Sequence, residues 1–175
     1  MKIGFFGGCF NPVTIAHIKL IENVIKQNKL DKVYFVPMGN SYKYMKTELV
    51  DLKYRVEMLE LALKDYEKID VLNILEDESK RMHAIDTFKI IDKMFEKEKR
   101  IYIMGSDNYE DMINWKDSDK LFSNYEYIIL DRNIESETKN ISSSLVREKV
   151  NLEESIDGLV PDIVKEYIEK NGLYK

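Results

Sequence analysis

The sequence FFGGCFNPVTIAH, residues 5–17, joins an apolar run to a segment with helical periodicity. The apolar run ends in Gly7 and Gly8, and an Asn-Pro turn follows. Beyond the turn, apolar residues recur at positions 18, 21, 24 and 25, which lie on one face of a helix over 15–27. A short buried strand, a glycine-containing turn and a helix together predict the first half of a βαβ unit.

The rest of the chain repeats this alternation of strand and helix. Short apolar runs predict strands at 3–6, 32–36, 70–74, 100–104 and 126–130. Helical spacing predicts further helices at 53–63, at 84–95, through Trp115 and Leu121, at 143–150 and at 161–171. The helix over 53–63 is expected to bury Tyr54, Met58, Leu61 and Ala62. We therefore expect an α/β fold: a Rossmann-like, doubly wound parallel sheet with helices on both faces, in a single domain over 1–175.

Composition and charge exclude several classes of protein. The chain has 175 residues, 44% hydrophobic and 34% charged, as is typical of a globular protein rather than a disordered one. A net charge of −5 argues against sequence-independent binding of nucleic acid, which needs a basic surface. No signal peptide and no apolar run long enough to span a membrane is recognisable. Cys9 has no second cysteine to pair with, so we expect a reducing, cytoplasmic location.

The turn after the first expected strand is a candidate anion site. Ligands of such sheets bind at the carboxyl ends of the strands, where Gly7, Gly8 and Phe10 are placed. Thr14 and His17 follow at the start of the helix and, three residues apart, face the same way. Helix N-termini attract anions, so this combination predicts a phosphate site. A glycine turn with a capping threonine is equally common as a purely structural feature, so this segment alone leaves both interpretations open.

A second candidate site follows near the end of the sheet. The sequence NISSSLVRE, residues 140–148, places Ser142, Ser143 and Ser144 before a helix and Arg147 one turn into it. Hydroxyl groups, main-chain N–H groups and a guanidinium group together can hold an anion, although a serine cap beside an exposed arginine is the simpler structural interpretation. Two such sites on one sheet suggest a polyphosphate between them.

These segments resemble a known superfamily. GGCFNPVTIAH (7–17) is similar to the nucleotidylyltransferase signature G-x-F-[DN]-P-x-[HT]-x-x-H, and ISSSLVR (141–147) resembles the second signature, ISST-x-[IL]-R. MGSDNYEDMINWKD (104–117), RVEMLELAL (55–63) and VPDIVKEYIEKNGLY (160–174) resemble segments of the nicotinate-nucleotide adenylyltransferases. Pantetheine-phosphate adenylyltransferases share the two signatures but not the tryptophan segment or the final Leu-Tyr. The resemblance covers nearly the whole chain.

The resemblance implies an enzyme that moves AMP from ATP to nicotinate mononucleotide, giving deamido-NAD and pyrophosphate. It implies catalytic roles for His17, Thr14 and Arg147. The implied ATP-binding residues are Gly7, Gly8, Phe10, Thr14, His17, Lys43, Gly105, Asp107, Ser142, Ser143, Ser144 and Arg147. The implied residues for the pyridine mononucleotide are Lys43, His83, Ala84, Thr87, Asp107 and Trp115. Mg²⁺ is expected to arrive on the ATP phosphates, without a metal site on the protein, and no feature of the sequence indicates an oligomeric state.

Three departures from the family pattern keep alternatives open. Thr14 stands where bacterial relatives usually have histidine, and PMGNSYKYMK (37–46) is closer to nicotinamide-nucleotide relatives. In place of the family's SYTxDT segment, 82–87 read MHAIDT and keep only its Asp-Thr half. The stretch between Leu130 and Ile141 is short. The alternatives are therefore the same reaction on nicotinamide mononucleotide, or a nucleotide-binding regulatory module without catalysis.

Overall fold

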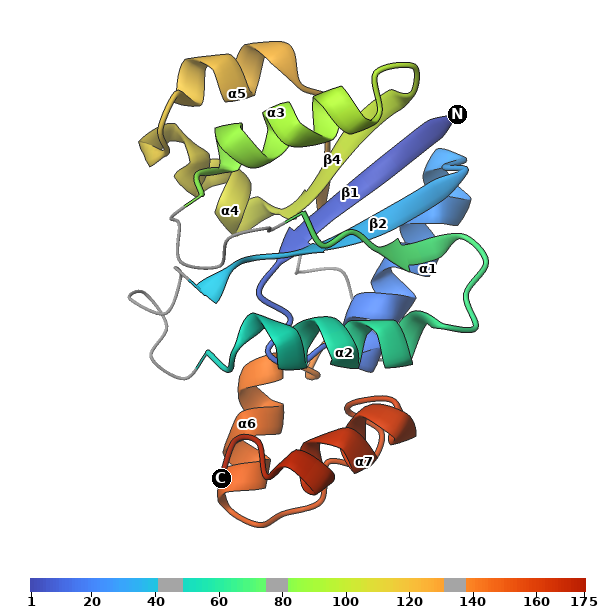
Figure 1. Cartoon of the computed structure of the whole chain (residues 1–175), viewed down its shortest axis with the longest axis vertical. Helices are drawn as coiled ribbons and strands as arrows, with labels where there is room; N and C mark the ends of the chain where they lie inside the picture. The colour runs from blue at the N-terminus through green and yellow to red at the C-terminus, as the bar shows by residue number, and fades with distance from the viewer. Residues whose placement is uncertain (41–48, 75–81, 131–137) are drawn as a thin grey trace.

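The computed structural model describes residues 1–40, 49–74, 82–130 and 138–175, and a parallel sheet forms its centre (Figure 1). The five strands found in these residues are β1 (Lys2–Gly8), β2 (Lys32–Pro37), β3 (Ile69–Val71), β4 (Lys99–Gly105) and β5 (Tyr127–Leu130). Their spatial order is β3-β2-β1-β4-β5, and every neighbouring pair is parallel. This order reverses direction between β1 and β4, which is where doubly wound sheets bind ligands. The predicted fold class is confirmed.

Two layers of helices cover the sheet, because the side chains of each strand alternate between its faces. Phe6 on β1 belongs to a buried cluster on one face, and Phe5 belongs to a second cluster on the other. The first cluster includes residues of α1 (Ile15–Asn28), α2 (Leu52–Leu63), α6 (Ser143–Asn151) and α7 (Asp162–Asn171). The second includes residues of α3 (Ala84–Met94) and α5 (Ser118–Asn124), with α4 (Ser106–Asp111) packed against it. In Figure 1, α6 and α7 lie below α1 and α2.

The caps of the helices agree with the sequence. Thr14 caps α1, Ser142 caps α6, and Pro161 immediately precedes the first residue of α7. Helix α7 ends at Asn171 and is followed by Gly172, whose φ of 59° is in the left-handed region that glycine adopts without strain. None of the helices in the described ranges is long and apolar enough to cross a membrane.

Three local predictions were wrong. The helical stretch through Trp115 and Leu121 is interrupted: α4 is followed by a 3₁₀ turn over Met112–Asn114, and α5 begins only after Asp117, whose left-handed φ of 56° stops a helix. The strand predicted at 70–74 is β3, which covers only Ile69–Val71, the residues that pair with β2. On α2 the buried face includes Arg55 and Leu59 and leaves Leu61 only partly buried, so it is rotated from the predicted one.

Candidate active site

The two glycines at the end of β1 have different surroundings. A Cβ atom added to Gly8 would lie 2.8 Å from Cζ of Phe10, so the Phe10 ring occupies the space beside this glycine. A Cβ atom added to Gly7 would meet no atom of the described residues within 4 Å. Gly7 is therefore the position at which a ligand can approach the main chain closely, whereas Gly8 makes room for a side chain of the protein.

The side chain of Phe10 belongs to the hydrophobic core beneath the turn after β1. Phe10 is only 3% exposed, and its ring packs against Phe6 and Phe35 with centroids 5.4 and 5.0 Å apart. The imidazole of His17 meets the same ring edge to face at 5.4 Å. The predicted contact of Phe10 with ATP is thus limited to its main chain, because the side chain belongs to the core.

Thr14 and His17 form a reciprocal cap at the start of α1. The main-chain N–H of Thr14 donates to Nδ1 of His17 at 3.1 Å, and Oγ1 of Thr14 lies 2.7 Å from the same nitrogen. The main-chain N–H of His17 in turn donates to Oγ1 of Thr14 at 3.4 Å. Because an N–H group can only donate, Nδ1 is an acceptor, and the proton of the neutral ring is carried by Nε2. The cap therefore sets both the orientation and the tautomer of the imidazole.

This geometry changes the part that Thr14 was expected to play. Thr14 is completely buried, and its hydroxyl is engaged with His17, so it is placed to orient the imidazole and not to contact a phosphate. The helix N-terminus is also less open than predicted: the first N–H of α1, on Ile15, donates to the carbonyl of Leu159 at 3.0 Å. Of the predicted donors at this helix start, the Ile15 N–H and the Thr14 hydroxyl are therefore already engaged within the protein.

The second signature meets the first at the Asn11–Pro12 turn. Oγ of Ser143 donates to the carbonyl of Pro12 at 2.7 Å, and Nη1 of Arg147 donates to the carbonyl of Asn11 at 2.9 Å. The other two serines stay on their own helix: Oγ of Ser142 accepts from the N–H of Leu145 at 3.1 Å, and Oγ of Ser144 lies 3.4 Å from Nη2 of Arg147. Two motifs more than 120 residues apart in sequence are thus brought together at one end of the sheet.

Arg55 is a residue of this region that the sequence analysis did not single out. Its side chain is fully buried and donates to three main-chain carbonyls, those of Val50 at 2.9 Å, Cys9 at 2.9 Å and Met38 at 2.6 Å. Cys9 follows β1 and Met38 follows β2, so one guanidinium ties the carboxyl ends of two strands together. An arginine among the apolar positions of an amphipathic helix was the available signal, since such a side chain is buried only when it is hydrogen-bonded.

The residues expected to contact ribose or the pyridine ring lie on the other side of the switch point. Gly105 is the last residue of β4 and the N-cap of α4, and Asp107 is exposed in the first turn of that helix. The indole Nε1 of Trp115 donates to Asp111 at 3.0 Å. This bond, with a second from Asn114, holds the pKa of the Asp111 carboxyl below its usual range. The Trp115 ring is half-buried and fixed in orientation, as a stacking platform requires.

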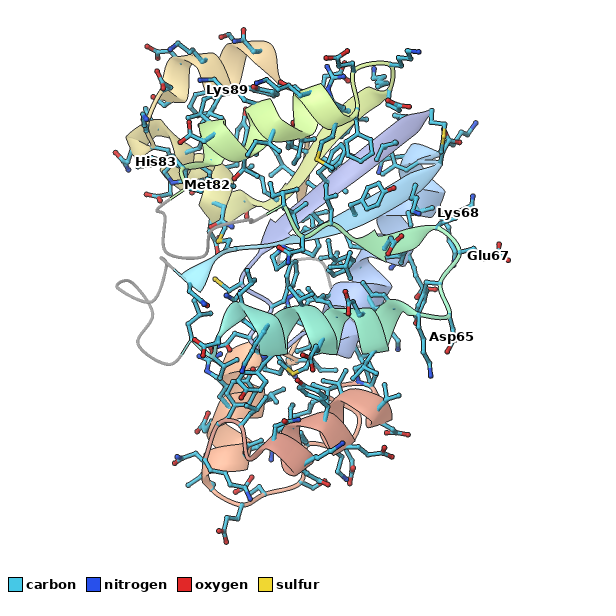
Figure 2. All side chains as sticks on the ribbon, viewed as in Figure 1. Asp65, Glu67, Lys68, Met82, His83 and Lys89 are labelled. Atoms are coloured by element: carbon cyan, nitrogen blue, oxygen red, sulfur yellow. The ribbon has the colours of Figure 1, made fainter. Side chains whose placement is uncertain are left out.

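His83 and Ala84 open helix α3, near the carboxyl edge of the sheet (Figure 2). The main-chain N–H of His83 donates to Oδ2 of Asp86 at 3.4 Å, so this donor is used within the helix cap. Thr87 is half-buried in the first turn of the same helix. Lys43, the remaining predicted residue, lies outside the described residues.

The whole sequence is similar to known proteins of one family. The chain matches the cytidylyltransferase-like family over residues 5–149. It is 31% identical to a protein of Dictyoglomus thermophilum described as a probable nicotinate-nucleotide adenylyltransferase, with 99% of this chain and 100% of that protein aligned. It is 28% identical to the nicotinate-nucleotide adenylyltransferase of Bacillus subtilis, over 99% of this chain and 98% of that one.

A solved structure has the same fold. The nicotinic acid mononucleotide adenylyltransferase of Plasmodium falciparum, in complex with NaAD, superimposes with a TM-score of 0.78. The superposition covers 99% of this chain and 97% of that one, at 21% sequence identity. At this identity the likeness concerns the arrangement of the main chain.

Proposed function

Because the chain belongs to the cytidylyltransferase-like family, and within it to the nicotinate-nucleotide adenylyltransferases, we propose that it transfers AMP from ATP to nicotinate mononucleotide. The products are deamido-NAD and pyrophosphate. The observation that carries this proposal is the meeting of the two signatures at the Asn11–Pro12 turn, which brings Arg147 to the strand end that also presents His17. We further propose that residues 1–175 act as one catalytic domain.

The reaction joins two anions without a covalent intermediate on the protein. An oxygen of the mononucleotide phosphate attacks the α-phosphorus of ATP, a new P–O bond forms, and the bond from the α-phosphorus to the bridging oxygen breaks. Pyrophosphate leaves with that oxygen. The attacking phosphate has a second pKa of about 6 and is mostly dianionic near neutral pH, so it needs no general base. The protein has to align the reactants and stabilise the charge that develops on the transferred phosphoryl group.

His17 and Arg147 supply this stabilisation. The cap formed with Thr14 leaves the imidazole proton on Nε2, where it can donate to a phosphate oxygen of ATP. The guanidinium of Arg147 adds a permanent positive charge beside the same turn and is held there by the Asn11 carbonyl. Lys43 and the α6 serines are proposed to contact further phosphate oxygens, and Gly105 and Asp107 to contact ribose. Mg²⁺ enters as part of the substrate MgATP, bound to its phosphates.

The pyridine mononucleotide is proposed to stack on Trp115 and to place its carboxyl group near His83 and Ala84. A preference for acid over amide depends on which donors and acceptors face that group. The usual hydroxyl side chains are missing from 82–84, and the His83 N–H is engaged by Asp86. These two observations favour nicotinamide mononucleotide as the second candidate substrate, and they lead us to expect a weaker acid preference than in relatives with the complete segment.

The substrate is identified by supplying each mononucleotide with MgATP and measuring pyrophosphate and the dinucleotide product. We expect kcat/KM to favour the acid by about 10- to 100-fold, corresponding to about 1.4–2.7 kcal/mol. A higher kcat/KM for the amide would make nicotinamide mononucleotide the substrate. Binding of ATP without pyrophosphate release from either mononucleotide would identify a nucleotide-binding regulatory module instead.

Gly7→Ala tests whether ATP approaches the main chain at the end of β1. The added methyl group meets no atom of the residues that the structure describes, so the free energy of unfolding should stay within about 0.5 kcal/mol of wild type. It would nevertheless occupy the space assigned to the nucleotide, and we expect the KM for ATP to rise about tenfold. Gly8→Ala is the matched control: its methyl group meets the Phe10 ring, which should cost about 1–3 kcal/mol of stability. An unchanged KM in a stable Gly7→Ala variant would place ATP elsewhere.

A further inference from the structure

The segment that follows α7 reaches back to the turn after β1. Leu173 is buried in the same core cluster as α1 and α2, and Tyr174 follows it. The hydroxyl of Tyr174 donates to Oδ1 of Asn11 at 3.0 Å, although the two residues are 163 positions apart. Neither composition nor the spacing of apolar residues predicts this contact.

Asn11 is the point at which several distant segments meet. Its side-chain oxygen accepts from Tyr174 and also from the N–H of Val50 at 3.2 Å. Its main-chain carbonyl accepts from Arg147 at 2.9 Å. Asn11 is only 5% exposed, so these partners cannot easily be replaced by water. Because the side chain and the carbonyl both belong to Asn11, hydrogen bonds that fix the side chain also restrict the direction of the carbonyl.

The state of the Tyr174 hydroxyl suits it to this contact. Burial raises the pKa of Tyr174, while the nearby guanidinium groups of Arg147 and Arg55 act in the opposite direction. The net shift is upward, so the phenol keeps its proton at neutral pH and can donate it to the Asn11 amide oxygen.

We propose that Tyr174 is a positioning residue for Arg147, acting through Asn11. The tyrosine anchors the Asn11 side chain, and the Asn11 carbonyl then holds the guanidinium in a fixed place. Arg147 is therefore already in position when charge develops on the transferred phosphoryl group. This role rests on the proposed adenylyl transfer. In this role Tyr174 acts through its hydrogen bond to Asn11 and not by contact with a substrate.

Tyr174→Phe removes the hydroxyl and keeps the ring. We expect kcat to fall about fivefold, the size of effect produced by losing one buried hydrogen bond, while the KM for ATP changes less than twofold. Tyr167→Phe is the matched control: the Tyr167 hydroxyl on α7 bonds the Glu57 carboxylate at 2.5 Å, away from the Asn11 turn. Its kcat should remain within about 1.5-fold of wild type. Equal kcat losses in the two variants would overturn the positioning role.

Two further measurements separate positioning from a general loss of stability. Tyr174→Phe combined with Arg147→Lys should lose less activity than the product of the two single losses, since both changes disturb one chain of contacts. Hydrogen exchange in the segment 9–18 should be faster in Tyr174→Phe and unchanged in Tyr167→Phe. Independent kinetic losses, or unchanged exchange, would refute the role while wild-type turnover still supports the proposed function. An inactive wild-type protein would overturn the proposed function and this role together.

Discussion

His17→Ala is expected to lower kcat by about 100-fold or more, the scale of losing one oriented donor to a charged transition state. The Thr14 cap engages Nδ1 of the imidazole and leaves the Nε2–H group as the donor, whereas alanine has no donor. The variant should still fold, because Thr14 retains its hydroxyl as a cap and alanine favours the helix. We expect the free energy of unfolding to fall by about 1 kcal/mol or less.

Steady-state kinetics with MgATP and nicotinate mononucleotide measure this effect. His17→Gln is an informative companion, because its side-chain amide carries an N–H at a similar reach and should retain more activity than alanine. Gln27→Ala, on the exposed far end of the same helix, controls for changes in α1 itself and should leave kcat unchanged. Turnover of His17→Ala close to that of wild type would remove His17 from the catalytic residues.

Arg55→Met is expected to lower the free energy of unfolding by about 3 kcal/mol or more. The methionine fills part of the space, but the carbonyls of Cys9, Met38 and Val50 lose a buried donor, and each unsatisfied group costs about 1–3 kcal/mol. Because two of these carbonyls lie at the ends of β1 and β2, we also expect the folded part of the Arg55→Met protein to bind ATP more weakly than wild type. Urea unfolding, followed by circular dichroism, measures the first effect.

Arg100→Met is the matched control for this change. Nη1 of Arg100 also donates to two main-chain carbonyls, those of Phe95 and Glu98, but its side chain is 28% exposed and water can take its place. Its expected cost is about 1 kcal/mol. If Arg55→Met does not fold, Arg55→Lys keeps the charge and loses the forked donors, so it should show an intermediate loss. Equal losses at positions 55 and 100 would contradict the role given to Arg55.

The elements of the fold follow from local patterns. Apolar runs of a few residues placed the strands, and 3.6-residue spacing placed α1, α3, α6 and α7 to within about two residues, because burial of one stripe or face is already encoded in short segments. Where the local pattern continued through a turn, the prediction was wrong. The break between α4 and α5 comes from a left-handed Asp117 that no spacing rule announces.

The candidate site was also predicted only in part from the sequence. Its main candidates, His17 and Arg147, were predicted from motifs, because the side-chain chemistry of a histidine at a helix start and of an arginine behind a run of serines can be recognised in the sequence. The contacts that hold this region together are seen only in the folded chain. Arg147 donates to the Asn11 carbonyl, Tyr174 donates to the Asn11 side chain, and Arg55 donates to three main-chain carbonyls. Every residue has a main-chain carbonyl, so no residue type marks the one that will accept such a bond. Which carbonyl meets which donor depends on how distant segments pack together, and that is a property of the tertiary structure.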